Sequence, residues 1–164
     1  LLDRDDVVTV IRQVLFLMRV GHPEIEFSEQ IPQAQVITDF DRRLIAQALT
    51  NIVKNATEAI AAVPVEERGK AKIDVALTFE KPGMVAIDIM DNGKGFPAEA
   101  RQRLLEPYMT TRAGGTGLGL AIVGKILEEH GGGVELLDRP DGQRGACVRL
   151  FFPLDQTQTG PRAA

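Results

Sequence analysis

Two glycine-rich runs contain residues that could form a nucleotide site. Residues 91–96 read DNGKGF and place a carboxylate, Asp91, where an apolar alternating segment ends. Gly93 and Gly95 relax the backbone, so a flat ring could lie against it while the carboxylate accepts a hydrogen bond from an exocyclic amine. Asp-Asn-Gly also forms turns by itself, so this run alone supports a plain turn as well as a site.

The second run, GGTGLGL at residues 114–120, opens an amphipathic segment. The sequence lacks the GxxxxGK[ST] pattern of a P-loop, and this run does not fit the G-x-G-x-x-G register of a dinucleotide site. It predicts a helix whose first turn offers the backbone amides of Gly117 to Gly119 to an anion, with about half a positive charge from the helix dipole behind them. A phosphate group is the natural ligand for such a helix start.

A third set of polar residues lies on the most strongly amphipathic segment, residues 41–62. Asn51, Asn55 and Glu58 are spaced by four and three residues, so they form one stripe beside the apolar face, with Lys54 at its flank. Amide and carboxylate oxygens are ligands that Mg²⁺ accepts, with water and phosphate oxygens completing the octahedron. The alternative is a row of solvated side chains on a surface helix, and the helix alone leaves both open.

The elements that must position these residues follow from hydrophobic periodicity and turn residues. Helices are expected at residues 5–20, 41–62, 97–105 and 117–130, the last with apolar positions Leu118, Ile122 and Ile126. Strands are expected at residues 25–31, 34–40, 73–79, 85–89, 134–138 and 145–152. Between them we expect loops at residues 64–70 and 106–116, the second mobile, and a disordered tail at 155–164. This order predicts an α+β two-layer sandwich, in which helices cover one face of a mixed, mostly antiparallel sheet.

Length and composition bound the class of protein. A chain of 164 residues with 44% apolar content suits one domain, and a net charge of -4 argues against a nucleic-acid partner. One cysteine, Cys147, permits no disulfide framework, and we expect it in the core. No apolar run approaches the roughly 18 residues of a membrane helix. The chain begins with Leu1 rather than Met, which we interpret as a piece of a longer protein.

Four segments in order resemble the N, G1, F and G2 boxes of histidine kinase catalytic domains. They are NIVKNATEAI at 51–60, DNGKGF at 91–96, EPYMTTR at 106–112 and GGTGLGLAIV at 114–123. These domains belong to the GHKL superfamily, which includes gyrase and MutL ATPases. The resemblance covers residues 35–153. The segments TTR and GTGLGLAIV are most similar to those of nitrogen-regulation sensor kinases of the NtrB and NtrY type. It implies the Bergerat-type ATP-binding fold.

The resemblance implies a role for the residues of the first two boxes. Asn55 matches the asparagine that binds Mg²⁺, and Asn51 matches the polar position one turn earlier that helps to hold the metal and the phosphates. Asp91 matches the carboxylate that recognises the adenine amine, and Gly93 and Gly95 give the adenine ring access to the backbone.

The last two boxes would contact the phosphates. Thr110, Thr111 and Arg112 fall in the F box and ATP lid, where a basic residue would approach the γ-phosphate. The phosphate-facing turn and helix start correspond to Gly115, Thr116, Gly117, Leu118 and Gly119. The final strand departs from the family pattern, because Ala146 and Cys147 stand where hydroxyl residues are usual. The resemblance therefore implies no adenine contact from that strand.

By resemblance, residues 1–154 form the ATP-binding catalytic domain of a two-component sensor histidine kinase. Residues 1–22 would lead from a phosphoacceptor domain that the chain lacks, because neither His22 nor His130 lies in a phosphoacceptor motif. The implied cofactors are ATP and Mg²⁺, and the γ-phosphate would pass to a histidine on a separate dimerisation domain, then to a response regulator.

We expect the isolated domain to be a monomer that binds ATP and ADP without autophosphorylating. The parent would be a homodimer with this domain in the cytoplasm, and an inner-membrane anchor is left open. Three rivals remain: an ATP-hydrolysing clamp, a kinase that phosphorylates serine in a regulator protein, and a scaffold that has lost catalysis. The clamp enzymes use a glutamate one turn before the metal asparagine, where this chain has Asn51.

Overall fold

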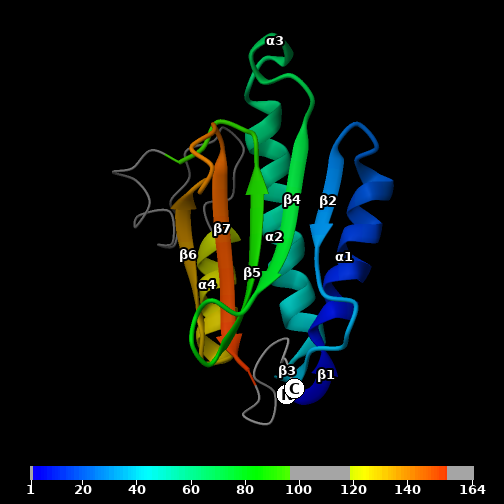
Figure 1. Ribbon diagram of the computed structural model, residues 1–164, viewed down its shortest axis with the longest axis vertical. Helices are drawn as coiled ribbons and strands as arrows, with labels where there is room; N and C mark the ends of the chain where they lie inside the picture. The colour runs from blue at the N-terminus through cyan, green and yellow to red at the C-terminus, as the bar shows by residue number, and fades with distance from the viewer. Residues whose placement is uncertain (1, 97–118, 155–164) are drawn as a thin grey trace.

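The computed structural model describes residues 2–96 and 119–154, and shows a sheet with helices on one face (Figure 1). The helices are α1 (Val7–Gly21), α2 (Arg42–Ala61), the four-residue α3 (Val65–Arg68) and α4 (Gly119–Glu129). The strands are β1 (Asp3–Asp6), β2 (Glu26–Gln30), β3 (Ile37–Phe40), β4 (Lys72–Thr78), β5 (Met84–Asp91), β6 (Gly133–Asp138) and β7 (Ala146–Pro153). In Figure 1, α2 and α4 lie behind the sheet and α1 lies beside β2, and all three helices pack into one core with the sheet, so the predicted two-layer sandwich is confirmed.

The main sheet has the strand order β2-β4-β5-β7-β6. Only β2 and β4 pair in parallel among these strands, and the other neighbours are antiparallel. A small second sheet pairs β1 with β3. The expected mixed, mostly antiparallel sheet is therefore confirmed, and β5 lies at its centre, with Asp91 at its last position.

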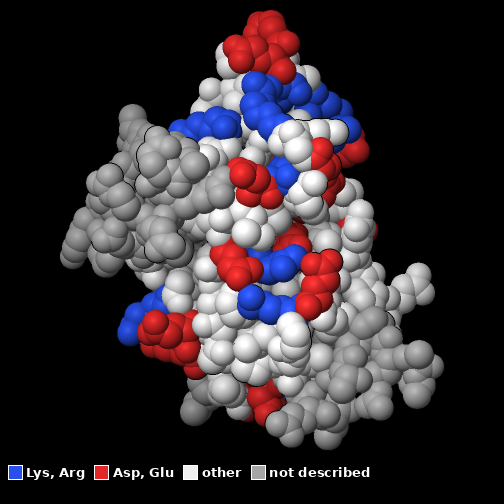
Figure 2. Space-filling view, turned by 60° about the vertical axis from the view of Figure 1, so that its left-hand side comes forward, with Lys and Arg blue, Asp and Glu red and all other residues white. Residues whose placement is uncertain are grey.

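Alternation along β5 separates the core from the open face of the sheet. Val85, Ile87 and Ile89 are at most 1% exposed and pack toward the helices. Asp88 points the other way and receives two hydrogen bonds from the Arg149 guanidinium, at 2.7 and 2.8 Å. Figure 2 shows acidic and basic side chains side by side over this part of the surface, so the open face carries paired charges.

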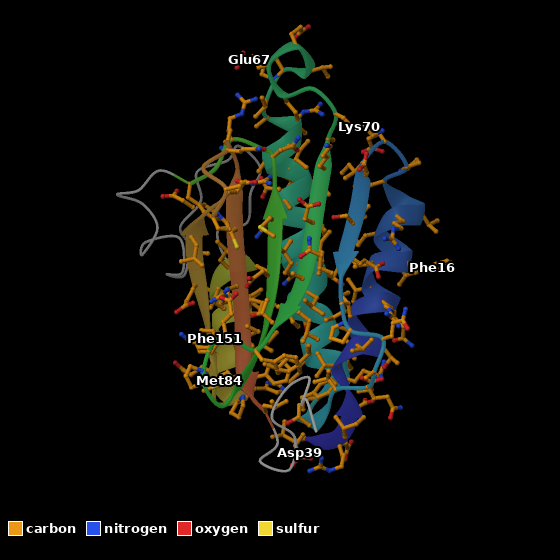
Figure 3. All side chains as sticks on the ribbon, viewed as in Figure 1. Phe16, Asp39, Glu67, Lys70, Met84 and Phe151 are labelled. Atoms are coloured by element: carbon orange, nitrogen blue, oxygen red, sulfur yellow. The ribbon has the colours of Figure 1, made fainter. Side chains whose placement is uncertain are left out.

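The interior between sheet and helices is filled by aliphatic and aromatic side chains (Figure 3). Phe40 and Phe152 pack there in a tilted arrangement, with ring centroids 5.7 Å apart. Cys147 lies on the other face of β7, the face of Arg149, but is only 2% exposed. Burial raises the pKa of its thiol to about 11, which agrees with the buried, structural role expected for it. No helix in residues 2–96 and 119–154 is long and apolar enough to cross a membrane.

The first helix starts later than the sequence suggests. It begins at Val7, because the Asp6 carboxylate caps it by accepting from the backbone nitrogen of Val8 at 3.0 Å. Asp3–Asp6 form β1 instead, paired with β3. The helix ends at Gly21, as expected, and its core-facing stripe is buried. Thus α1 packs into this domain's own core.

Two other sequence expectations need correction. Residues 65–68 form α3 where a loop was expected. On α4 the buried face runs through Leu120, Val123, Ile126 and Leu127, whereas Ile122 is 41% exposed. A single three-point pattern was too sparse to fix the helix phase. The helix expected at 97–105, the loop at 106–116 and the tail at 155–164 lie outside the described residues.

Candidate functional site

Helix α2 carries the polar stripe along the border of its buried face. Its apolar positions, from Ile45 to Ile60, lie in the core as their spacing predicted. Asn51 and Asn55 are half-buried at the edge of that face, while Lys54 and Glu58 are exposed. The two asparagines are therefore not fully solvated surface amides, because each lies beside the buried, apolar face of α2.

The DNGKGF turn after β5 packs directly on α2. A Cβ atom at position 93 would lie 2.5 Å from the carbonyl carbon of Ala59, so only glycine fits there. The amide of Lys94 donates to the Ala59 carbonyl oxygen at 3.3 Å. Because Ala59 follows Asn55 by one helical turn, the DNGKGF segment contacts α2 one turn beyond the asparagine.

The beginning of α4 lies against the same part of α2. Gly119 is the first described residue of that helix, and a Cβ atom there would lie 4.0 Å from the Nδ2 atom of Asn55. The DNGKGF turn and Gly119 of the second glycine-rich run, far apart in sequence, thus lie against α2 at positions one turn apart, at Ala59 and Asn55.

Asp91 is the buried carboxylate of this arrangement. It is 4% exposed, and its Oδ1 atom accepts a hydrogen bond from the Gly93 amide at 2.7 Å. Burial raises its pKa to about 6, while the amides of Gly93 and Ala146 and the cation of Arg139 act in the opposite direction. The side chain is therefore ionised near neutral pH although little water reaches it.

The neighbouring Asn92 fixes the turn to the rest of the domain. Its Oδ1 atom accepts from the amide of Lys72 at 3.0 Å, and its Nδ2 atom donates to the carbonyl oxygen of Lys70 at 2.7 Å. The sequence identified this residue only as turn chemistry. Its two hydrogen bonds join the residues at the start of β4 to the turn that follows β5.

Two residues that sequence reasoning missed lie against the carbonyl group of Asp91. Arg139, whose side chain is 9% exposed, donates from Nη1 to the Asp91 carbonyl oxygen at 3.2 Å. Gly145 has φ of +130°, and a Cβ atom there would overlap the same carbonyl oxygen. The only sequence signal was the turn at 139–142, which gives no indication of what its arginine reaches.

The set of candidate metal ligands suits magnesium bound together with a phosphate. Residues 2–96 and 119–154 contain no group of three or more His, Cys, Asp or Glu side chains that could hold a metal ion. Mg²⁺ commonly takes one or two protein oxygens and fills its octahedron with water and phosphate oxygens. The half-buried Asn55 amide, next to the first turn of α4, fits that pattern.

Several predicted site residues lie outside the described residues: Thr110, Thr111, Arg112, Gly115, Thr116, Gly117 and Leu118. Their roles stay predictions. Of the two histidines, His130 is 7% exposed and follows the last turn of α4, while His22 follows α1 beside Glu24 at 3.5 Å. Both are helix-end residues, as expected.

These features, a mixed sheet with helices on one face and a glycine turn and helix start meeting on α2, are those of a nucleotide-binding α+β domain. Residues 40–156 match the family described as histidine kinase-, DNA gyrase B-, and HSP90-like ATPase. The chain belongs to this family.

Its similarity within the family is to sensor histidine kinases. It is 57% identical over 161 residues to the nitrogen regulation protein NtrY of Azorhizobium caulinodans, covering 98% of this chain and 20% of that protein. It is 35% identical over 134 residues to sensor histidine kinase ZraS of Klebsiella oxytoca, covering 82% of this chain and 27% of that one. The chain thus spans about a fifth to a quarter of these relatives' length.

Solved structures agree with the sequence relatives. The catalytic domain of histidine kinase ThkA superposes with a TM-score of 0.79 at 27% identity, covering 94% of this chain and 96% of that one. A mycobacterial sensor histidine kinase, MprB, gives a TM-score of 0.76 at 28% identity, covering 94% and 98%. The family and the NtrY-type similarity expected from the four boxes are confirmed.

Proposed function

We propose that residues 1–154 form a catalytic domain that binds Mg-ATP and presents its γ-phosphate to a histidine on a separate dimerisation domain of the parent kinase. One observation carries this proposal: the turn that bears Asp91 and the start of α4 lie against α2 one turn apart, at Ala59 and Asn55. A nucleotide with its base at the first position would have its phosphates at the second.

Each residue has a defined task in this proposal. The Asp91 carboxylate accepts a hydrogen bond from the adenine amine, with Gly93 and Gly95 letting the ring approach the backbone. Asn55, helped by Asn51, holds the magnesium ion, and the amides at Gly117 to Gly119 bind phosphate at the start of α4. Thr111 and Arg112 belong to the lid, with Gly115, Thr116 and Leu118 in the turn beside the phosphates.

Catalysis by these groups is positioning and charge neutralisation. A nitrogen of the incoming imidazole attacks the γ-phosphorus in line, a nitrogen–phosphorus bond forms, and the bond to the bridging oxygen of ADP breaks. Magnesium would neutralise charge that develops on the phosphate oxygens. The residues of this chain orient the nucleotide, and Arg112 would add a positive charge near the γ-phosphate. The imidazole proton leaves to a group on the partner domain.

The residue at position 51 distinguishes the proposed function from that of a clamp ATPase. A clamp ATPase needs a carboxylate one turn before the metal asparagine to activate water, and an amide cannot take up that proton. We therefore expect hydrolysis to be slow. Supplying candidate acceptor proteins distinguishes a serine kinase of this fold, and a scaffold would fail to bind nucleotide.

Binding is tested by calorimetry with a non-hydrolysable ATP analogue and Mg²⁺. The unaltered chain should bind, Asp91→Ala should abolish binding, and Glu66→Ala, an exposed position on α3, should leave it unchanged. Asn55→Ala should weaken binding in the presence of Mg²⁺ far more than in its absence. Unchanged affinity of Asp91→Ala would reject the adenine assignment.

Phosphoryl transfer is tested by mixing the chain with the dimerisation helices of an NtrY-type kinase and ATP. Acid-labile phosphohistidine should form on the helices, and Asn55→Ala should lose it. Alone, the domain should remain monomeric and unphosphorylated. We propose a homodimeric parent, a cytoplasmic position for this domain, and a response regulator as the downstream acceptor.

A further inference from the structure

We propose that Arg139 is a positioning residue of the nucleotide site, which fixes the end of β5 and with it the Asp91 carboxylate for adenine recognition. This inference rests on the proposed function, because it concerns the pocket in which Asp91 would bind the base. Arg139 lies in the β6–β7 turn, outside all four boxes, and its side chain reaches the backbone of Asp91.

The first step is the way in which Arg139 is held. Its Nε and Nη2 atoms donate to the two carboxylate oxygens of Asp141, at 3.1 and 2.7 Å, a fork that fixes the plane of the guanidinium. Nη2 also lies 3.9 Å from a carboxylate oxygen of Asp74 on β4. Two carboxylates thus aim a side chain that is only 9% exposed.

The second step is the contact with Asp91. Nη1 of Arg139, the nitrogen outside the fork, donates to the Asp91 carbonyl oxygen at 3.2 Å. Asp91 is the last residue of β5, and the neighbouring strand β7 pairs with it through Ala146. The arginine therefore satisfies the carbonyl at the point where the strand gives way to the DNG turn.

The third step is the close approach that makes this contact possible. Gly145, at φ +130°, has no space for a side chain because a Cβ atom would overlap the Asp91 carbonyl oxygen and lie 3.1 Å from the Cδ atom of Arg139. A Cβ atom at Gly95 would in turn lie 3.0 Å from the Gly145 carbonyl oxygen. The DNG turn is thus packed between α2 and the β6–β7 turn.

The fourth step is charge. Arg139 is the cation that acts on the Asp91 carboxylate, opposing the burial that raises its pKa. Asp74 on β4 and Asp141 in the same turn act on Arg139, and the neutral thiol of Cys147 on β7 lies close enough to interact with Asp91. On α2 the ionisable side chains of the adjoining turns, Lys54 and Glu58, are exposed. Without Arg139 the buried carboxylate would hold its proton at higher pH.

The test compares Arg139→Gln and Arg139→Lys with Arg144→Gln. Arg144 is a matched control because it lies in the same turn, is exposed, and contacts Glu67 instead of Asp91. Affinity for the ATP analogue is measured by calorimetry between pH 5.5 and 8.5, and the pKa of Asp91 is followed by carbon NMR of its labelled carboxyl group in the nucleotide-free chain.

We expect Arg139→Gln to weaken binding about tenfold at pH 6.5, with a smaller loss at pH 8.5, and to move the Asp91 titration to higher pH. Arg139→Lys should keep the Asp91 titration close to that of the unaltered chain, because it retains the charge. Arg144→Gln should match the unaltered chain in both affinity and titration. If Arg139→Gln binds as tightly as the unaltered chain at every pH, or loses affinity equally at every pH with no change in the Asp91 titration, the proposal is wrong.

A milder variant covers the case in which Arg139→Gln does not fold. Asp141→Asn keeps the arginine but loosens its fork, and it should shift the Asp91 titration in the same direction by a smaller amount. No shift would count against the proposal. Failure of the proposed function looks different, because the unaltered chain itself would then bind no nucleotide, whereas the NMR titration would still report the Arg139–Asp91 relationship.

Discussion

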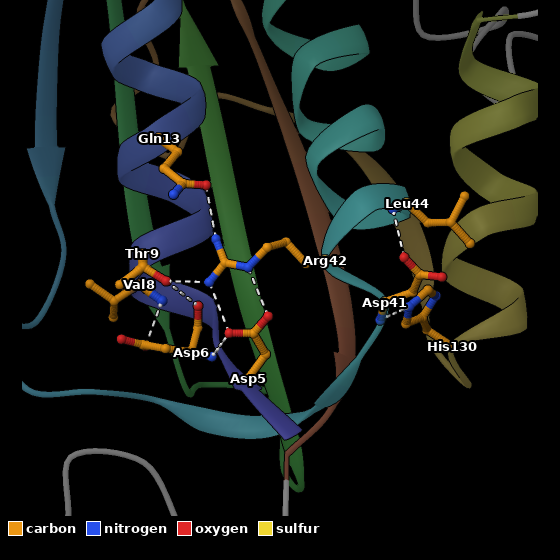
Figure 4. A network of polar contacts seen from close by, with 9 residues as sticks. All are labelled: Asp5, Asp6, Val8, Thr9, Gln13, Asp41, Arg42, Leu44 and His130. Atoms are coloured by element: carbon orange, nitrogen blue, oxygen red, sulfur yellow. Dashed lines mark hydrogen bonds and ion pairs between the residues drawn. The ribbon is translucent and has the colours of Figure 1, made fainter. Parts of the chain in front are cut away.

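The backbone amide of Asp41 donates a hydrogen bond to Nε2 of His130 at 3.0 Å, which joins the start of α2 to the end of α4 (Figure 4). The other ring nitrogen, Nδ1, lies 2.8 Å from the carbonyl oxygen of Ile126. Nδ1 therefore carries the proton and donates, while Nε2 accepts, so the neutral ring fits this position. The link fixes the relative position of the two helices that carry Asn55 and Gly119.

His130→Ala should lower the free energy of unfolding by about 1–3 kcal/mol, because it leaves a backbone amide without its acceptor and opens a space beside Phe152. Urea denaturation measures the change. His22→Ala is the matched control, since His22 is a helix-end histidine whose contact with Glu24 is at the surface, and it should change stability by less than about 0.5 kcal/mol. Equal effects of the two variants would contradict the role given to His130.

Gly93→Ala should prevent nucleotide binding and destabilise the fold, because the new methyl group would collide with the α2 backbone at Ala59 and Ile60, at 2.5 to 2.7 Å. Relieving that overlap requires the DNG turn to move away from the helix, by a shift that costs on the order of 3 kcal/mol or more. Thermal unfolding and calorimetry with the ATP analogue measure the two effects.

The control for this substitution is Gly124→Ala in the middle of α4, where a Cβ atom would meet no atom within 4 Å. That change should stabilise the domain by about 0.5–1 kcal/mol, because alanine is the better helix former. A destabilised Gly124→Ala, or a fully stable and binding-competent Gly93→Ala, would show that the packing described at these positions is incorrect.

Asp91→Asn should alter the pH dependence of stability in a defined direction. The folded-state pKa of Asp91 is about 6, above its ordinary value of 3.8, so the protonated form is favoured by folding. This contribution is fully present below the ordinary value and is lost as pH rises through about 6. Relative to the unaltered chain, the variant should therefore gain up to about 3 kcal/mol in unfolding free energy between pH 4 and pH 7.5.

Urea denaturation of both proteins across that range measures this difference. Nucleotide affinity should follow the opposite trend, since the unaltered chain needs the ionised carboxylate and should bind less tightly below pH 6. A difference in stability between the two proteins that does not vary with pH would exclude a raised pKa at Asp91. The site thus carries a buried charge that folding alone does not favour.

Local patterns were enough to predict most helices and strands of this domain. The α2 stripe and the alternation in β5 repeat over many residues, so the helical and strand periods are well determined. The start of α1 was misjudged because Asp5 and Asp6 resemble the acidic first turn of a helix. Their backbone instead pairs with β3, more than thirty residues away, and no local pattern reports such pairing.

The candidate site divides in the same way. Asn55, Asp91 and Gly119 lie in motifs that can be recognised in the sequence. In the structure Gly93, two residues after Asp91, and Gly119 lie against α2 at Ala59 and Asn55. Arg139 and Gly145 escaped notice because their importance lies in a contact with a strand that ends almost fifty residues earlier. A turn sequence predicts the bend of the chain and says nothing about which distant carbonyl its side chains reach.

Arg42→Ala should loosen the attachment of β1 and α1 to α2. The Arg42 guanidinium donates to both carboxylate oxygens of Asp5, at 2.7 and 2.8 Å, and to the hydroxyl of Thr9 and the amide oxygen of Gln13 (Figure 4). Because the pair is about one-third exposed, we expect a loss of about 1 kcal/mol, and less than that for Arg43→Ala, whose side chain is exposed.

The pH dependence identifies the partner. Hydrogen bonds from Arg42 lower the pKa of Asp5, so the stability that the pair provides is present above the ordinary aspartate value and is lost as pH falls through the lowered one. The difference in stability between Arg42→Ala and the unaltered chain should therefore become smaller below about pH 4, in acid titrations followed by circular dichroism. A constant difference from pH 2 to pH 7 would mean that Arg42 acts through packing of its side chain and not through the Asp5 carboxylate.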